Sequence, residues 1–250
     1  MIAVLLAAGS LPSFAQAPDL IDADRPGLAD ASTVVGKGWL QVETGFQWEE
    51  HPGQTAAFFP TLFRIGLADR FEARFEGNTF VTVSAEDQRQ SGLAPASIGF
   101  EWLVSRRSGR RPGLGIIGRV SPAWGTGDFV SRHVTSDARL AADWDFADHW
   151  SLNPNVGVAA YEADAGDFVA GLLALTLAFA PRDGVSWFVD SGVQMPEAEG
   201  GTTSVVVDGG VAYICGRNWQ VDLSAGTRVH GETAPHPFVA IGLAYRHKSS

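Results

Sequence analysis

The sequence predicts an all-β protein, specifically a transmembrane antiparallel up-and-down β-barrel of about 12 strands. Three observations lead to this prediction. Apolar and polar residues alternate along many segments, polar side chains share one face of most of them, and short connections alternate with longer ones. In residues 40–48 the apolar face of an extended chain carries Leu40, Val42, Phe46 and Trp48. In an outer-membrane barrel such a face meets lipid, and the polar face lines a lumen.

The N-terminus predicts export. Residues 2–11 form a short apolar run, residues 12–13 break it, and the small-x-small sequence of residues 15–17 is typical of a signal-peptidase site. The run is too short to span a bilayer as a helix. We therefore expect a signal peptide at 1–17 and a mature chain that starts at Pro18. An N-terminal segment, 18–36, should be either a periplasmic tether or a plug, and residues 37–250 should form the barrel.

Twelve segments with two-residue periodicity follow, separated by turn signals. The expected strands are 38–48, 56–67, 70–80, 95–104, 113–122, 136–146, 149–160, 167–179, 184–195, 203–214, 218–229 and 237–247. Most have a readable phase, such as 138–146, whose apolar residues alternate with Arg139, Asp143 and Asp145. Segment 167–179 is apolar on both faces, so its phase cannot be assigned. Tryptophans near several segment ends fit the aromatic belts of a membrane interface.

The connections support a membrane barrel. The connections 67–70, 147–149, 180–184 and 216–218 are short, and a nine-residue one, 105–113, lies in the same series. Longer ones intervene at 49–56, 81–95, 123–136, 162–167, 196–203 and 230–237. Outer-membrane barrels have short periplasmic turns and longer external loops. We therefore expect the long connections to face outside, which a soluble exported barrel has no reason to show.

Charged residues on the polar faces are the candidate site. The expected inward acids are Glu43, Glu72, Glu76, Glu101, Asp143, Asp145, Asp190, Asp208 and Asp222, and the bases are Arg64, Arg74, Arg119, Arg139 and Arg228. A dry core would not tolerate unpaired charges, whereas a wet lumen does. The set with a predicted transport role is Glu43, Arg64, Arg74, Glu101, Arg119, Asp143, Asp208 and Asp222. Nine acids against five bases favour cations or neutral polar solutes. The alternative is a paired network that props the barrel open or shut.

The stretch "DADRPGLAD", residues 22–30, precedes the first expected strand and contains a Pro-Gly pair that a strand disfavours. It is a candidate plug, with Asp24, Arg25 and Pro26 entering the lumen so that Arg25 meets wall carboxylates. The alternative is a periplasmic tether, because terminal segments stay disordered unless they are tied down.

Several functions are disfavoured. The net charge of −10 argues against nucleic acid as a partner. Cys215 is the single cysteine, so an intrachain disulfide is excluded. The loop histidines lack metal-ligand spacing, so we expect no metal site and no cofactor. His149 and Ser151 share a face but make a poor catalytic pair, and no Gly-x-Ser-x-Gly elbow is present, so we expect no enzyme.

The motif "DADRPGLADASTVVGKGWLQVETGFQW" (22–48) resembles the start of the outer-membrane transporter family labelled "phenol-degradation meta-pathway protein". The stretches "FRIGLADRFEARFEGN" (63–78), "DGGVAYICGRNWQVDLSAG" (208–226) and "FVAIGLAYRH" (238–247) are similar to its second hairpin and closing strands. The resemblance implies an outer-membrane barrel that moves small molecules, with aromatic or hydrophobic compounds as candidates, and it brings no catalytic residues. Such barrels usually end on an aromatic residue, whereas here His247 occupies that position and Tyr245 precedes it.

The resulting hypothesis is passive transport of a small-molecule solute through the outer membrane of a Gram-negative cell. Outer-membrane lipid and the barrel-assembly machinery are the other expected partners. Three alternatives remain open: a barrel with a structural role, a lipid-modifying barrel enzyme, and a soluble exported barrel that binds an apolar ligand. The enzyme should carry a Ser/His pair at the lipid boundary, and the soluble barrel should be apolar inside and polar outside.

Overall fold

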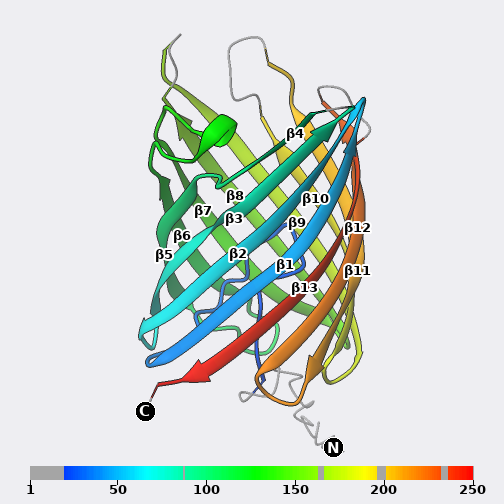
Figure 1. Cartoon of the computed structure of the whole chain (residues 1–250). Coiled ribbons are helices and arrows are strands. Elements are labelled where there is room, and N and C mark those ends of the chain that lie inside the picture. The colour runs from blue at the N-terminus through cyan, green and yellow to red at the C-terminus, as the bar shows by residue number, and fades with distance from the viewer. Residues whose placement is uncertain (1–19, 87, 163–165, 196–200, 232–235, 250) are drawn as a thin grey trace, which may run out of the picture.

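The computed structural model is a closed antiparallel barrel whose strands run obliquely around a central lumen (Figure 1). It describes residues 20–249 except 87, 163–165, 196–200 and 232–235, so the expected signal peptide lies outside the described residues. The strands are β1 (Trp39–His51), β2 (Gln54–Ala68), β3 (Phe71–Ala85), β4 (Gln88–Gly92), β5 (Ala96–Ser105), β6 (Gly113–Ser121), β7 (Thr135–Ala147), β8 (Trp150–Tyr161), β9 (Phe168–Arg182), β10 (Val185–Gln194), β11 (Ser204–Cys215), β12 (Trp219–His230) and β13 (His236–Lys248).

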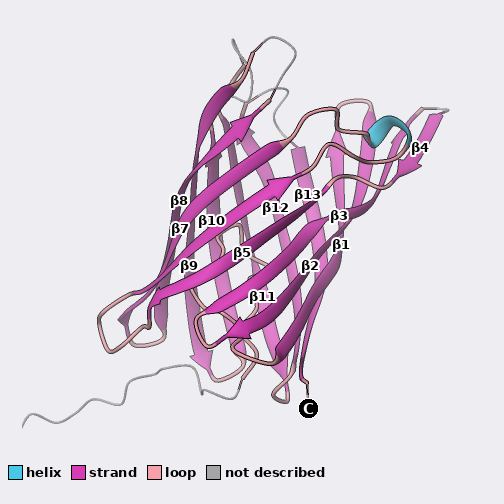
Figure 2. Cartoon of the chain, turned by 90° about the vertical axis from the view of Figure 1, so that its left-hand side faces the viewer, coloured by secondary structure: helices cyan, strands magenta, loops and turns pink. Residues whose placement is uncertain are grey.

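Twelve of these strands form the barrel wall, which confirms the predicted fold class. Each pairs antiparallel with its neighbours, and β1 closes the sheet by pairing with β13 from Trp39–Lys248 to Glu49–Phe238. The short β4 pairs with the last residues of β3, Val81–Ala85, while β5 pairs with its first residues, Phe71–Gly77. A short 3-10 helix, η1 (Gly127–Phe129), lies against β4 (Figure 2). Just outside the two elements, Thr126 N donates to the Leu93 carbonyl oxygen at 3.0 Å and Leu93 N donates to Thr126 Oγ1 at 2.8 Å.

The two faces of the wall differ sharply in polarity. Outward side chains are large and apolar, and Leu223, Ile241 and Val158 are all more than half exposed. The buried inward side chains include most of the charged residues of the strands, and Glu43, Arg64 and Glu101 have no exposed surface. This arrangement matches the predicted lipid face and lumen face, and it is the reverse of a soluble barrel with an apolar interior.

Two predicted loops are in fact mostly strand. The connection expected at 49–56 is wrong: β1 and β2 pair as far as His51–Gln54, and Gly53, with φ +75°, helps close the hairpin in two residues. The connection expected at 81–95 contains the end of β3 and all of β4, which pair from Val81–Gly92 to Ala85–Gln88. Cross-strand hydrogen bonds satisfy the backbone there, so polar composition did not imply a loop.

The phase of β9, which the sequence left unassigned, follows side-chain size. Ala174, Thr176 and Ala178 face the lumen, while Leu173, Leu175 and Leu177 are exposed on the outer face. Both faces lack charge, but the inner face carries mainly small residues, with Leu172 as an exception, and the large ones meet the membrane. This part of the wall leaves free space in the lumen.

Candidate functional site in the barrel lumen

The N-terminal segment, residues 20–38, lies inside the barrel before β1 begins (Figure 1, dark blue). It has no strand pairing, so its backbone donors need other acceptors. Wall side chains supply them: Arg25 N donates to Glu43 Oε2 at 3.0 Å and Val35 N donates to Glu72 Oε2 at 2.7 Å. On the other side of the lumen, Leu28 N donates to Asp190 Oδ2 at 3.0 Å. Carboxylates on the wall strands therefore accept from backbone N–H groups of the segment, in place of the carbonyl oxygens of a neighbouring strand.

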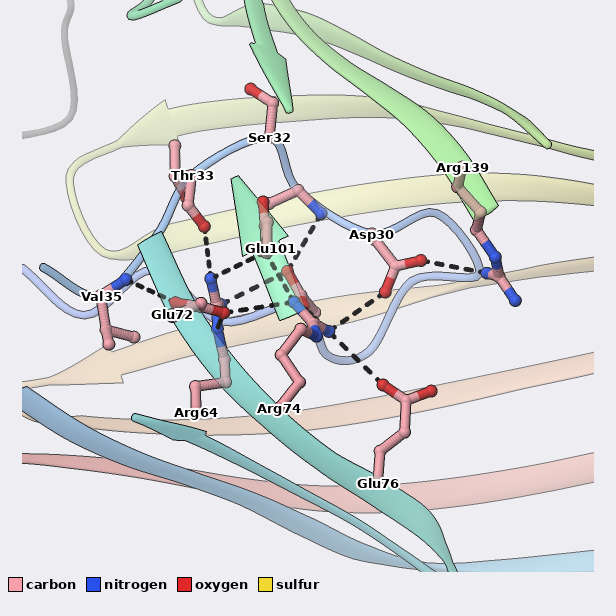
Figure 3. A network of polar contacts seen from close by, with 12 residues as sticks. Asp30, Ser32, Thr33, Val35, Arg64, Glu72, Arg74, Glu76, Glu101 and Arg139 are labelled. Atoms are coloured by element: carbon pink, nitrogen blue, oxygen red, sulfur yellow. Dashed lines mark hydrogen bonds and ion pairs between the residues drawn. The ribbon is translucent and has the colours of Figure 1, made fainter. Parts of the chain in front are cut away.

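Arg64 of β2 and Arg74 of β3 form the centre of a buried ion-pair network (Figure 3). Arg64 Nε contacts Glu72 Oε1 at 2.7 Å, and Arg74 Nη1 contacts Glu101 Oε2 at 2.7 Å. Both arginines also contact Asp24 of the N-terminal segment, and Arg64 Nη2 donates to the carbonyl oxygen of Thr33. Because buried charges are stable only when paired and hydrogen-bonded, this network joins the segment to the wall.

Asp30 joins a second group of arginines to the same network. Its carboxylate contacts Arg74 at 3.2 Å, Arg139 at 3.0 Å, and Arg119. Its backbone N–H donates to Asn155 Oδ1 at 2.9 Å. Burial disfavours ionisation of this carboxyl group, but the three arginines outweigh burial and hold the pKa of Asp30 well below its usual range. Asp30 therefore stays ionised in its docked position.

The Arg25 guanidinium packs against the backbone of two strand glycines, and this glycine contact is called the Arg25 seat. Gly45 of β1 and Gly242 of β13 lie opposite each other in the closing pair of strands. A Cβ atom at Gly45 would come within 2.7 Å of Arg25 Nη2, and one at Gly242 within 2.3 Å of Arg25 Nε. The guanidinium then reaches Asp222 Oδ1 at 3.3 Å. Glycine in a strand interior commonly marks such a close approach.

The N-terminal segment divides the free space of the lumen into chambers. Toward the long loops, a β1 chamber of about 510 Å³ is lined by Gln47, Glu49, Glu76 and Phe238, and a β9 chamber of about 510 Å³ by Ala174, Gly192, Gln194 and Val206. Toward the short turns, a periplasmic chamber of about 520 Å³ is lined by Asn153, Thr176, Ala178, Ser186, Phe188 and Gln220. Arg25, Pro26 and Gly27 border both the β1 chamber and the periplasmic chamber.

The structure places all the proposed transport residues on the inner wall, but it does not gather them into one ring. Glu43, Arg64, Arg74 and Glu101 lie together in the central network, and Arg119 joins them through Asp30. Asp143 binds Ser32, which donates to it from both its backbone N and its Oγ at 2.6 Å. Asp222 pairs with Arg25, and Asp208 lies opposite Asp190 between β10 and β11. The three candidate plug residues, Asp24, Arg25 and Pro26, lie within the lumen.

Sequence reasoning missed several contributors. Asp30 was part of the quoted stretch but was not singled out, although an acid within a Pro-Gly segment that precedes a barrel is a natural partner for inward arginines. Asn153 and Asn155 of β8 donate to the Asp30 carbonyl oxygen at 3.2 and 2.9 Å. Their same-face spacing in a polar phase was the available signal. Leu28 and Gly27 carried no signal, because their importance depends on which strand they meet.

Comparisons with known proteins gave one family match and several solved structures of similar fold. The model of the family described as "Putative MetA-pathway of phenol degradation" matches residues 23–246. No curated protein matches the sequence. Among solved structures, an outer membrane channel from Pseudomonas putida F1 superposes with a TM-score of 0.68 at 11% identity, covering 86% of this chain and 98% of that one.

Two porins are similar to a lesser degree. The NanC porin superposes with a TM-score of 0.57 at 5% identity, covering 82% of this chain and 98% of its own. The KdgM porin superposes with a TM-score of 0.53 at 10% identity, covering 81% and 98%. At these identities the likeness concerns the fold.

Proposed function

Because this chain belongs to the phenol-degradation family whose model matches residues 23–246, we propose that it is a passive outer-membrane channel for small molecules, with aromatic or hydrophobic compounds as candidate solutes. Its barrel is of the outer-membrane type, with an apolar outer face and a polar inner one. The observation that supports transport is the lumen itself, which has chambers at both ends and a docked segment between them.

The size of the barrel limits the solute. A lumen enclosed by 12 strands is wider than that of an eight-stranded barrel and narrower than that of a 16-stranded porin. The N-terminal segment fills much of this width through the network around Arg64 and Arg74. We propose that the segment acts as a plug and that small solutes pass beside it or after it shifts. The predicted preference for cations remains part of the proposal, because acids outnumber bases on the inner wall.

We propose no catalytic activity. The His149–Ser151 pair, the one enzymatic candidate, lies at the β7–β8 turn, and His149 Nδ1 contacts the Ala180 carbonyl oxygen at 2.7 Å. A sealed barrel with a structural role is the second candidate function, because the ion-pair network occupies the centre of the lumen. Delivery by the barrel-assembly machinery, with Tyr245 near the end of β13 as the aromatic residue that it recognises, is part of the same proposal.

Conductance distinguishes transport from a sealed barrel. The purified mature protein and a variant without residues 18–36 are each inserted into planar bilayers and proteoliposomes. We expect small cation-preferring current steps for the mature protein and larger steps for the variant, because the deletion exposes a wet, net-negative lumen. Heat-dependent migration on gels checks that both are folded. If both proteins are silent and both kinds of proteoliposome stay closed to small solutes, the transport proposal is wrong.

A further inference from the structure

The N-terminal segment is fixed to one side of the lumen far more strongly than to the other. Its ion pairs reach Arg64, Arg74, Arg119 and Arg139 on β2, β3, β6 and β7, and Asp222 on β12. Within the described residues, a single hydrogen bond joins it to the wall formed by β9, β10 and β11, from Leu28 N to Asp190 Oδ2 at 3.0 Å. The barrier between the chambers is therefore weakest along β9–β11.

The side chains at that weak point are small or apolar. Leu28 extends toward Gly192 of β10, where an added Cβ would lie 3.3 Å from Leu28 Cδ1. Gly27 lies against Thr176 and Asp190, 3.3 and 3.1 Å from the position of its own missing Cβ. The β9 chamber ends at Leu28 on one side, and the periplasmic chamber ends at Gly27 on the other. Two residues of the segment thus separate the chambers along this wall.

A row of hydrogen-bond acceptors crosses the same wall. Thr176, Asp190 and Asp208 lie directly opposite one another on β9, β10 and β11. Asp190 is 1% exposed and Asp208 is 8% exposed. The Oδ1 atoms of both aspartates are buried and have no partner of good hydrogen-bond geometry in the described structure, while the Thr176 hydroxyl lies beside the Asp190 carboxyl group. Unpartnered buried acceptors are costly, so a ligand that donates hydrogen bonds would be stabilised there.

From these observations we propose that solutes cross the lumen along the β9–β11 wall, past Leu28, and that the row Thr176–Asp190–Asp208 selects small uncharged molecules that carry hydroxyl or amide donors on an apolar body. This inference rests on the proposed channel function and deepens it. The donors of such a molecule satisfy the acceptor row, while its apolar part contacts Leu28, Phe188 and Ala212. A carboxylate anion is disfavoured, since it brings no donor to the row and adds negative charge beside two facing aspartates. Chambers of about 510 and 520 Å³ are large enough for a molecule with one ring.

The charge selection is tested with two solutes of nearly the same shape. Mandelamide and mandelate share a phenyl ring and a hydroxyl group, and they differ in an amide against a carboxylate. Uptake into proteoliposomes is measured by rapid filtration, and the rate into protein-free liposomes is subtracted. We expect mandelamide to enter at least about tenfold faster than mandelate. Thr176→Val, which keeps the shape and removes the Oγ1 acceptor, should lower mandelamide uptake several-fold.

The route is tested with a matched pair of substitutions that narrow the lumen. Ala174→Leu adds bulk on β9 within the proposed path, and Ala240→Leu adds the same bulk at a lumen-facing position on β13, outside it. We expect Ala174→Leu to reduce mandelamide uptake at least fivefold and Ala240→Leu to change it less than twofold, while Leu28→Ala raises it. Ala174→Val replaces Ala174→Leu if the latter does not give a heat-modifiable barrel.

The possible results distinguish a failure of the channel function from a failure of the proposed route or selectivity. If neither the mature protein nor the variant without residues 18–36 admits either solute, the channel function itself fails. If the mature protein admits mandelamide but the two leucine variants behave alike, the route is wrong and the channel function stands. If mandelate enters as fast as mandelamide, or Thr176→Val has no effect, the selection by the acceptor row is wrong.

Discussion

Replacing Asp30 by asparagine removes a negative charge that lies among Arg74, Arg119 and Arg139 without changing the shape of the side chain. Breaking a buried ion pair by removing one partner typically costs about 3–5 kcal/mol. Each arginine keeps another partner, such as Glu101 for Arg74 at 2.7 Å, so the lower end of that range applies. We expect the docked N-terminal segment to lose about 3 kcal/mol, which corresponds to about a 100-fold rise in its undocked fraction.

Asp22 supplies the matched control in the same segment. Its carboxylate accepts a hydrogen bond from Thr33 Oγ1 at 2.7 Å and has no ion pair within the described residues. Burial, with the nearby Asp143 charge, raises the pKa of Asp22 above its usual value. An asparagine at this position keeps an acceptor for Thr33 and removes a charge that burial disfavours. Asp22→Asn should therefore change docking by less than about 1 kcal/mol.

Cysteine labelling measures the undocked fraction. Ala29 is 6% exposed within the segment, so Ala29→Cys in a Cys215→Ser background is protected while the segment is docked. When undocking is fast and reversible, the alkylation rate follows the undocked population. We expect Asp30→Asn to raise the rate about 100-fold and Asp22→Asn to change it less than fivefold in either direction. Equal rates in the two variants, or a rise below tenfold for Asp30→Asn in a folded barrel, would refute the reasoning.

Four further predictions follow from the same structure. The protein should fractionate with the outer membrane and migrate in a heat-dependent manner on denaturing gels, so a soluble periplasmic product would contradict its assignment. A tag in loop 123–136 should be reachable by antibody on intact cells and a tag in turn 216–218 should not, and equal labelling of both would reverse or remove this orientation. Gly242→Ala should displace Arg25 and raise labelling at position 29 by about tenfold, and an unchanged rate would show that the seat is not needed. When the pH is lowered from 7 to 5, the labelling rate at position 29, divided by the rate for the unfolded chain at the same pH, should fall. The contribution of Asp30 to docking is retained because its pKa is held low, whereas protonation of Asp22, whose pKa is raised, relieves the penalty of burying its charge and tightens docking. Asp22→Asn should remove this tightening.

The sequence predicted the wall well because one physical rule governs it. Alternation places Glu43 and Arg74 inward and Leu223 outward wherever one face is polar, and the structure has them there. The rule was uninformative for β9, whose two faces are both uncharged, and side-chain size rather than polarity decided its orientation. It also overestimated the connection at 49–56, because a strand that continues past the membrane into water can be polar on both faces.

The position of the N-terminal segment could not be derived in the same way. Arg25 needs Gly242 and Asp222, which the pairing of β12 with β13 brings together, and Gly45, which the closing pair β1–β13 adds. No local pattern encodes that meeting, because it depends on the register of β1 against β13. The alternation of polar and apolar residues could indicate that the inward arginines needed oppositely charged partners. It could not indicate that Asp24 and Asp30 were those partners or that Leu28 would lie against the arginine-free wall at Gly192 and Asp190.

The distribution of contacts to the N-terminal segment has a consequence for the order of assembly. Its acceptors and donors come from strands as far apart as β1 and β12, and the Arg25–Asp222 pair joins residues 197 positions apart in the chain. The ion pairs of Asp24 and Asp30 need only β2, β3, β6 and β7, whereas the contacts of Arg25 need β1 and β12 in the same wall. The complete set of contacts therefore exists only in the closed barrel, so Arg25 cannot reach its final position before β1 has paired with β13.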